Sequence, residues 1–187
     1  MHIDLDQLIA DCRDAVAADP SHRAVREVVA RAVAEPAAVL KQFEPLAAGV
    51  HKLYHSDNLT ILNVVWPPLF TIMPHDHRMW AVIGIYSGAE DNMYWRRVGE
   101  PGHTRIEAAG ARALRTGDVE PLGRDIVHSV TNPVQRLTGA IHVYGGDFYG
   151  VERAEWDPQT LKERRYDREE HARLFAEANR RFARETS

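Results

Sequence analysis

Cysteine is nearly absent from this chain, which has one, Cys12, among 187 residues. A single cysteine cannot form a disulfide within the chain, and this is typical of proteins in a reducing compartment. Cys12 falls on the apolar stripe of a predicted helix. We therefore expect a buried thiol that packs like a small apolar group.

Long apolar runs and surplus positive charge are also missing. No apolar run approaches membrane-spanning length, and residues 1–6 lack the basic start and apolar centre of a signal peptide. The formal net charge of -4 and the pI near 6.2 give no electrostatic footprint for nucleic acid. We expect a cytoplasmic protein with no nucleic-acid or membrane partner, and the sequence leaves its oligomeric state open.

Apolar residues recur at helical spacing at both ends of the chain. This period predicts helices over residues 3–18, after a cap at Ser21, from Pro36 onwards, and over residues 167–185. The first three helices fall within residues 1–47 and are expected to cover the outside of a sheet. Residues 148–187 are expected to form a C-terminal extension, with an irregular segment over 147–158 before its helix.

Short segments rich in β-branched and aromatic residues fill residues 49–147. Turn signals separate them, and the predicted strands cover residues 50–55, 59–66, 80–87, 92–98, 103–108, 111–116 and 138–144. Many short strands with few helices between them predict a mainly β sandwich or barrel, whose closed sheet exposes few edges. At 187 residues we expect one domain over 1–187.

Histidines in three places suggest a metal site inside that barrel. His75 and His77 are separated by one residue in a segment of β character, so both side chains point to one face of the strand. Taken alone, such a pair is more often two polar residues on a wet face. Further along, His128 and the run His142-Val143-Tyr144 lie at plausible strand spacings.

The segment 117–132, which contains His128, joins with His75-x-His77 and Gly88 to form a pattern that resembles the two motifs of the cupin superfamily. The resemblance implies a double-stranded β-helix (jelly-roll) barrel, and it makes His128 the third metal ligand. Many cupins add a glutamate a few residues after the first pair. Here residues 80–82 are apolar, and the nearest acid, Glu90, lies beyond the next turn.

Three neutral imidazoles leave a divalent metal with its full charge and about half of an octahedral shell open. A thiolate and dioxygen can then bind side by side. For this reason the chain is more specifically similar to the cysteine dioxygenase family of thiol dioxygenases, as a divergent bacterial-type member. That resemblance implies an Fe(II) cofactor, a small thiol and dioxygen as substrates, and a sulfinic acid as product.

The run Ala140-Ile141-His142-Val143-Tyr144 is similar to the Ser-x-His-x-Tyr run of that family. The resemblance implies that Tyr144 donates a hydrogen bond near bound oxygen or substrate and that His142 orients the phenol. The serine of the family is Ala140 here. The hydrogen-bond chain behind His142 must therefore end on another group.

The arginine or glutamine that clamps the substrate carboxylate in this family should lie near residues 54–58, where no arginine occurs. Arg78, Arg96 and Arg97 are the alternatives, although we expect each to form a surface salt bridge. His51, His55 and His103 have no partner pattern and are expected to be ordinary strand or turn residues, with His55 the one expected to come closest to the site.

The large aromatic residues of the predicted strands could wall the site, but they are more often part of the core. This interpretation covers Trp80, Tyr86 and Trp95.

Two other functions fit the same histidines. A metal-holding cupin could bind or sense a small molecule without turning it over, which would agree with the missing arginine and serine. Zinc also accepts three imidazoles and a water molecule, and the protein would then be a hydrolase. The sequence fixes neither the metal, zinc or another divalent ion being possible, nor the identity of the thiol.

Overall fold

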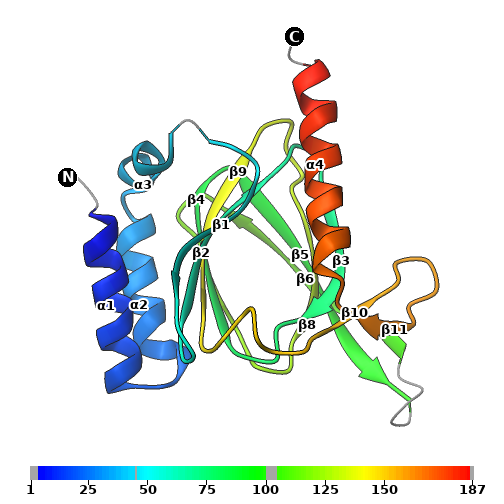
Figure 1. Cartoon of the computed structure of the whole chain (residues 1–187), viewed down its shortest axis with the longest axis horizontal. Coiled ribbons are helices and arrows are strands. Elements are labelled where there is room, and N and C mark those ends of the chain that lie inside the picture. Colours follow the sequence, from blue (N-terminus) through cyan, green and yellow to red (C-terminus); the bar gives the residue numbers. More distant parts are fainter. Residues whose placement is uncertain (1–3, 45, 100–104, 186–187) are drawn as a thin grey trace.

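The computed structural model describes residues 4–44, 46–99 and 105–185, and in these ranges it has four helices and eleven strands (Figure 1). Three helices precede the strands and one follows them. The helices are α1 (Leu5–Ala18), α2 (His22–Val33), α3 (Pro36–Phe43) and α4 (Arg168–Glu185). None of them is long and apolar enough to span a membrane.

The N-terminal helices begin where polar caps and a proline predict. Asp4 accepts hydrogen bonds from the backbone at the start of α1, and Ser21 accepts one from the Arg23 backbone N–H at the start of α2. Pro36 opens α3, where its missing N–H costs no hydrogen bond. The three predicted helices are confirmed, apart from residue 3, which lies outside the described residues.

Eleven antiparallel strands form two sheets in the described part of the chain. The first has the order β1 (Gly49–His55), β2 (Thr60–Trp66), β9 (Thr138–Tyr144), β4 (Ala81–Ser87) and β7 (Val119–Leu122). The second has the order β11 (Glu163–Arg165), β10 (Ala154–Trp156), β3 (Thr71–Asp76), β8 (Val127–Thr131), β5 (Ala89–Val98) and β6 (Arg105–Arg115). Strands far apart in sequence, such as β2 and β9, are neighbours, as a jelly roll requires. The predicted cupin-type double-stranded β-helix is confirmed.

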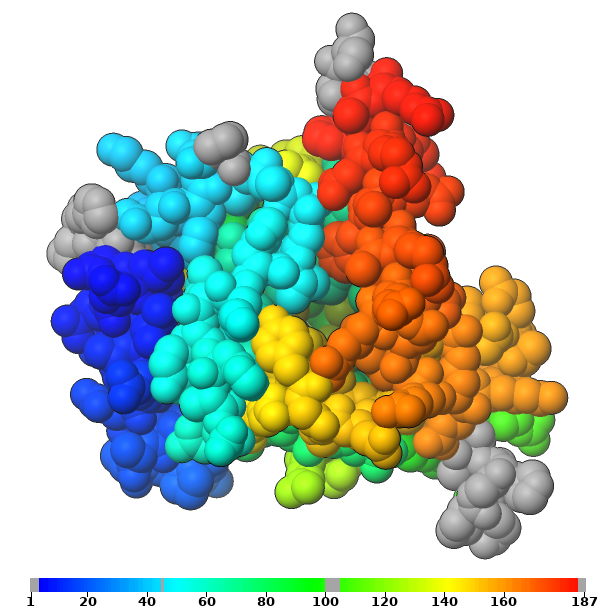
Figure 2. Space-filling model, viewed as in Figure 1, coloured from blue at the N-terminus to red at the C-terminus, as the bar shows by residue number. Residues whose placement is uncertain are grey.

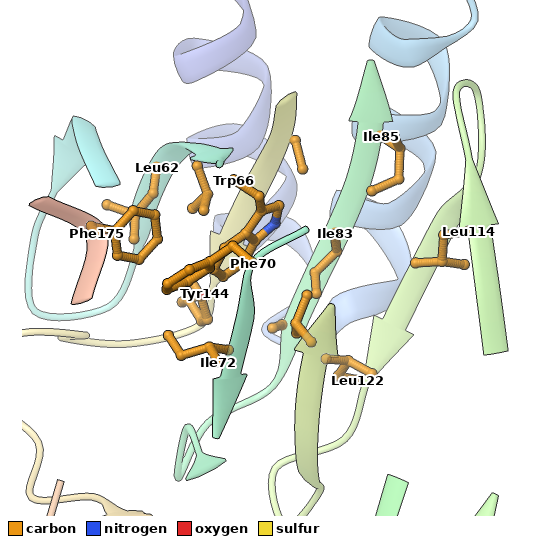
Figure 3. Packing of buried hydrophobic residues seen from close by; sticks show 14 of the residues in the cluster. Leu62, Trp66, Phe70, Ile72, Ile83, Ile85, Leu114, Leu122, Tyr144 and Phe175 are labelled. Carbon is orange, nitrogen blue, oxygen red and sulfur yellow. The ribbon is translucent and has the colours of Figure 1, made fainter. Parts of the chain in front are cut away.

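Side-chain alternation along β9 divides the core in two. Ile141 and Val143 face outward and pack with the N-terminal helices, whereas His142 and Tyr144 point between the sheets. Figure 1 shows the blue helices against one side of the barrel and the red α4 on the other. The inner core includes Leu62, Trp66, Ile83 and Leu122, which are labelled in Figure 3.

The strand prediction was wrong at residues 103–116 and 147–158, and β7, β8 and β11 lie outside the predicted strand ranges. Residues 103–108 and 111–116 were expected to be separate strands, but their described part is one strand, β6, with a bulge opposite Tyr94 and Trp95 in place of a turn at Gly110. The segment 147–158 was expected to be irregular, yet it contains β10. A strand of three residues is too short to show a period of two in the sequence. It is defined by its pairing with β3, where Glu155 lies opposite His75.

Helix α4 lies along the mouth of the barrel. Its Phe175 ring stacks on Trp66 with centroids 5.6 Å apart and contacts Phe70 at 4.9 Å. Figure 3 shows Leu62, Trp66, Phe70 and Phe175 gathered on one side of the cluster. Asn179 donates a hydrogen bond of 3.0 Å to the Ala48 carbonyl. The helix is therefore tied to β2 and to the start of β1.

Candidate metal centre

Three histidines from neighbouring strands meet inside the barrel. His75 on β3 lies opposite His128 on β8 in the antiparallel register, and His77 follows directly after β3. The Nε2 atom of His77 is 3.2 Å from that of His75 and 3.2 Å from that of His128. All three side chains are buried. The structure thus brings together the three predicted ligands.

Two of the rings are oriented by neighbouring acceptors. His75 Nδ1 donates to the Met73 carbonyl at 3.0 Å, and His128 Nδ1 lies 2.7 Å from the Asn92 side-chain oxygen. A proton on Nδ1 leaves the Nε2 lone pair free for a metal, which is the usual arrangement behind histidine ligands. His77 Nδ1 has no hydrogen-bond partner among the described residues.

The donor set fits a divalent transition metal. Nitrogens bound about 2.1 Å from one ion at roughly 90–110° lie about 3.0–3.4 Å apart. Both separations from His77 fall in this range, and all three ligand atoms lie within 4.8 Å of one another. Burial lowers the pKa of His75 and His77 well below 6.5 and that of His128 to about 4. The imidazoles are therefore neutral, so a metal displaces no proton on binding.

Behind this group, Tyr144 and His142 contact each other as the sequence predicts. The Tyr144 hydroxyl lies 3.0 Å from His142 Nδ1, and its ring centroid is 5.0 Å from that of His77. Burial lowers the pKa of His142 to about 3 and raises that of Tyr144. The imidazole is thus neutral and the phenol keeps its proton.

No serine ends the hydrogen-bond chain behind His142 in this protein, and Glu90 lies there instead. Its Oε2 lies 3.9 Å from His142 Nε2 and accepts a 2.8 Å hydrogen bond from the Trp66 indole. Its Oε1 accepts from the Asn92 amide at 2.9 Å, and Asn92 in turn contacts His128. Glu90 is therefore not a metal ligand. It lies behind the ligands, near His142 on one side and linked to His128 through Asn92 on the other.

The three-histidine group opens into a cavity of about 430 Å³. Apolar side chains of β2, β3, β8 and α4 line most of it, and it reaches the surface between β1 and α4, where Val50 and Ala176 are exposed. In Figure 2 the surface is hollowed between the cyan β1 and the orange-to-red α4. Among the described residues that line this cavity there is no carboxylate.

Arg153, which the sequence did not single out, lies in this cavity. It is 5% exposed, and its guanidinium group stacks between the Phe148 and Tyr166 rings at 3.9 and 4.1 Å. None of its three nitrogens has a hydrogen-bond partner within the described part of the chain. A buried, unpaired cation is costly unless something completes its contacts. Arg153 follows irregular chain after β9, and only the pairing of β10 with β3 turns it inward.

Opposite Tyr144, a second phenol is held in a similar way. The Tyr166 hydroxyl lies 3.2 Å from His171 Nδ1, and His171 Nε2 lies 2.7 Å from a carboxylate oxygen of the buried Glu155. Glu155 also pairs with Arg164 at 2.8 Å. This group comes from the C-terminal extension, which no motif covered. Its Tyr166 and His171 line the cavity, and Glu155 lies behind them.

The other arginine candidates lie outside the cavity. Asp76, fully buried, binds Arg78 at 2.7 Å and Arg97 at 2.6 Å, so it is a structural acid on the face opposite the ligands, as its position between His75 and His77 predicted. Arg96 is exposed and pairs with Glu107. Each of the three arginines forms a salt bridge, as expected, but only that of Arg96 lies at the surface, because Arg78 and Arg97 share the buried Asp76.

The remaining predictions divide between core and surface. His55 pairs with Asp147 at 2.7 Å and does not itself line the cavity, although its ring contacts that of Tyr149, which does. Trp80 donates to the Pro20 carbonyl, and Tyr86 packs with the helical layer. Trp95 donates to Ser129. His103 lies outside the described residues.

Cys12 is buried under α2, and burial raises the pKa of its thiol to about 12. It is the unreactive packing group that the sequence predicts.

No family model matches the chain. Similar solved structures include an RmlC-like cupin family protein with a double-stranded β-helix fold from Methanocaldococcus jannaschii, with 12% identity and a TM-score of 0.46 over 56% of this chain and 85% of that one. A conserved protein with a double-stranded β-helix domain from Klebsiella pneumoniae has 13% identity and a TM-score of 0.46, over 62% of this chain and 87% of that one.

An oxalate oxidase in complex with the substrate analogue glycolate has 16% identity and a TM-score of 0.41, with coverage of 55% of this chain and 52% of that one. At these values the similarity is one of fold alone. The assignment of the jelly roll rests on the sheet order of this chain, and the chemistry of the site rests on its own residues.

Proposed function

We propose that this protein is an iron(II)-dependent dioxygenase that converts a small thiol carrying a carboxylate group into its sulfinic acid. The observation that carries the proposal is a cavity in which three buried, neutral imidazoles converge beside a protonated phenol and an unpaired arginine, with no carboxylate among the described lining residues.

The absence of acids from the described lining favours this chemistry over hydrolysis. A zinc hydrolase commonly uses a carboxylate near the open position as general base, and the acid nearest to the site, Glu90, is buried behind it with its oxygens turned to Trp66 and Asn92. The reaction itself balances without another reductant. Both atoms of dioxygen join the sulfur, which is oxidised as the dioxygen is reduced.

A ferrous ion, when bound by His75, His77 and His128, would supply the redox chemistry between thiolate and dioxygen. The chain supplies position and a dry site. Tyr144 donates its phenol proton to the reacting group, and His142 holds the phenol in place. Arg153 binds the substrate carboxylate, since this ion pair would complete the contacts that its guanidinium lacks in the protein.

The decisive experiment combines metal analysis with product analysis. Protein purified without added metal is assayed for iron and zinc, then reconstituted with ferrous iron and tested for oxygen uptake with 3-mercaptopropionate, cysteine and cysteamine. We expect iron-dependent uptake, fastest with an acid thiol, and a product heavier by two oxygen atoms.

Two histidine variants complete the test. His128→Ala should lose both iron and turnover, whereas His55→Ala, whose ring lies outside the cavity, should keep both. If iron and turnover survive in His128→Ala, the ligand assignment is wrong. If the iron-loaded protein binds thiols but consumes no oxygen, the protein is a binder or sensor. If zinc alone supports hydrolysis, the zinc alternative holds.

A further inference from the structure

Among the described residues, Glu90 is the one carboxylate that lies near His142 and also contacts Asn92, the residue that orients His128. It is completely buried. Neither of its oxygens points into the cavity, so it touches neither substrate nor metal. Burying an acid is costly, so we expect Glu90 to act on His142 and Asn92, the groups that it contacts behind the cavity.

We propose that Glu90 is a positioning residue whose protonation state selects the tautomer of His142 and thereby decides whether the Tyr144 proton points to the substrate. The effect on catalysis rests on the proposed function. The change of tautomer itself depends only on the contacts of Glu90, His142 and Tyr144.

Two arrangements of protons fit the observed contacts. When Glu90 is protonated, its hydroxyl faces the bare Nε2 of His142, so the imidazole proton sits on Nδ1 and is donated to the Tyr144 oxygen. The phenol proton is then free for the cavity. When Glu90 loses its proton to solvent, the carboxylate attracts the imidazole proton to Nε2, and Nδ1 becomes an acceptor that captures the phenol proton.

The distances allow this coupling. The 3.0 Å contact between His142 and Tyr144 serves in either direction. The 3.9 Å gap between Glu90 and His142 is longer than a hydrogen bond. The last torsion of Glu90 is a broad and soft one, so the proposal requires only a rotation that brings Oε2 closer to His142 Nε2.

The surroundings of Glu90 place this change near neutral pH. Burial raises its pKa from 4.5 to about 7, and the hydrogen bonds from Asn92 and Trp66 oppose that rise. The charged neighbours are Asp91 and Glu120, which both favour the protonated form. Glu120 is itself paired with Arg112 and with the Tyr94 hydroxyl. Below pH 7 the phenol proton faces the cavity, and above pH 7 it is withdrawn.

Glu90→Gln tests the proposal because an amide has no proton to lose at any pH in this range. In the iron-loaded wild type, kcat/KM for 3-mercaptopropionate should fall about tenfold per unit above pH 7. In Glu90→Gln this decrease should be absent, and kcat/KM should change less than twofold between pH 6.5 and 8.5. Asp91→Asn, which removes the charge of the neighbouring acid, should keep this decrease and move it to lower pH, because Asp91 favours the protonated form of Glu90.

A second measurement needs no activity. The ¹⁵N shifts of the His142 ring in metal-free protein report which nitrogen carries the proton. We expect the proton to move from Nδ1 to Nε2 between pH 6 and 8 in the wild type and to stay on Nδ1 in Glu90→Gln. An unchanged tautomer in the wild type, or a decrease above pH 7 that persists in Glu90→Gln, would overturn the inference. If the protein oxidises no thiol and the tautomer still switches, only the proposed function fails.

Discussion

At the scale of single residues, the site contains ionisable side chains that a stable core would normally avoid. Arg153 is buried without a hydrogen-bond partner among the described residues, and Glu90 is buried without a cation beside it. Two aromatic rings stack on the Arg153 guanidinium, and the neutral donors Trp66 and Asn92 bind the Glu90 carboxylate. Such costs are typical of functional sites, where binding a ligand or a proton offsets them.

Replacing Arg153 by methionine should separate binding from stability. The affinity for 3-mercaptopropionate should fall roughly 10- to 100-fold, because a charge-assisted pair is lost, whereas the affinity for cysteamine, which has no carboxylate, should not fall. The free energy of unfolding should change by less than about 1 kcal/mol, since the loss of stacking on Phe148 and Tyr166 offsets the relief of a buried charge. Calorimetric titration and urea unfolding measure the two effects.

The matched control is Arg165→Met, because Arg165 is exposed and pairs with Glu152 outside the cavity. It should leave both affinities unchanged. An equal loss of affinity for 3-mercaptopropionate and cysteamine in Arg153→Met would contradict a carboxylate-binding role.

At the scale of elements, two helices cover the barrel in different ways. Helix α2 packs on β4 over a glycine, and a Cβ built on Gly84 would lie 2.4 Å from Val29 Cγ1 and 2.9 Å from Val33 Cγ1. Helix α4 instead crosses the mouth and lines the cavity with one face. The first contact supports the wall of the barrel, and the second shapes its opening.

The close packing of α2 predicts a stability effect without an effect on the site. Gly84→Ala should lower the free energy of unfolding by about 1–3 kcal/mol, because the helix must move away to admit a methyl group. The metal content should stay that of the wild type, since α2 lies on the outer face of the sheet. Urea unfolding and metal analysis check the two parts.

Gly123→Ala serves as the control, because a Cβ there would meet nothing within 4 Å. Its stability should stay within about 0.5 kcal/mol of the wild type. A Gly84→Ala protein that unfolds like this control would mean that α2 packs less tightly than the structure indicates.

At the scale of the whole molecule, the metal site and the fold depend on each other. The ligands come from β3, the turn after it and β8, so they converge only when the second sheet is formed. A metal that binds the folded form and not the unfolded chain stabilises the fold by mass action. Metal binding should therefore be visible in thermal unfolding even without turnover.

Ferrous iron or zinc at about one hundred times its dissociation constant should add about 2.7 kcal/mol. For a chain of this length that amount corresponds to an increase in Tm of roughly 5–11 °C. Anaerobic scanning calorimetry with and without metal measures it. The increase should disappear in His77→Ala and persist in His55→Ala. An increase that survives in His77→Ala would point to a different metal site.

Much of the fold was predictable because its signals are local. Helical spacing and capping residues gave α1 to α3, and β-branched segments between turns gave most strands of the first sheet. Strands β10 and β11 were missed, because each has three residues and depends on a partner far away in the sequence. The bulge in β6 was missed because Gly110 gives the same local signal for a bulge as for a turn.

The sequence by itself determined which side chains share a face, because a period of two places His75 with His77 and His142 with Tyr144. His128 followed only from the resemblance to the cupin motifs. The tertiary structure alone decided what surrounds them. Glu90 on the second sheet lies near His142 on the first. Arg153 lines the cavity beside the metal site, next to β10, which pairs with β3. Burial and long-range pairing set these positions, and neither leaves a periodic pattern in the chain.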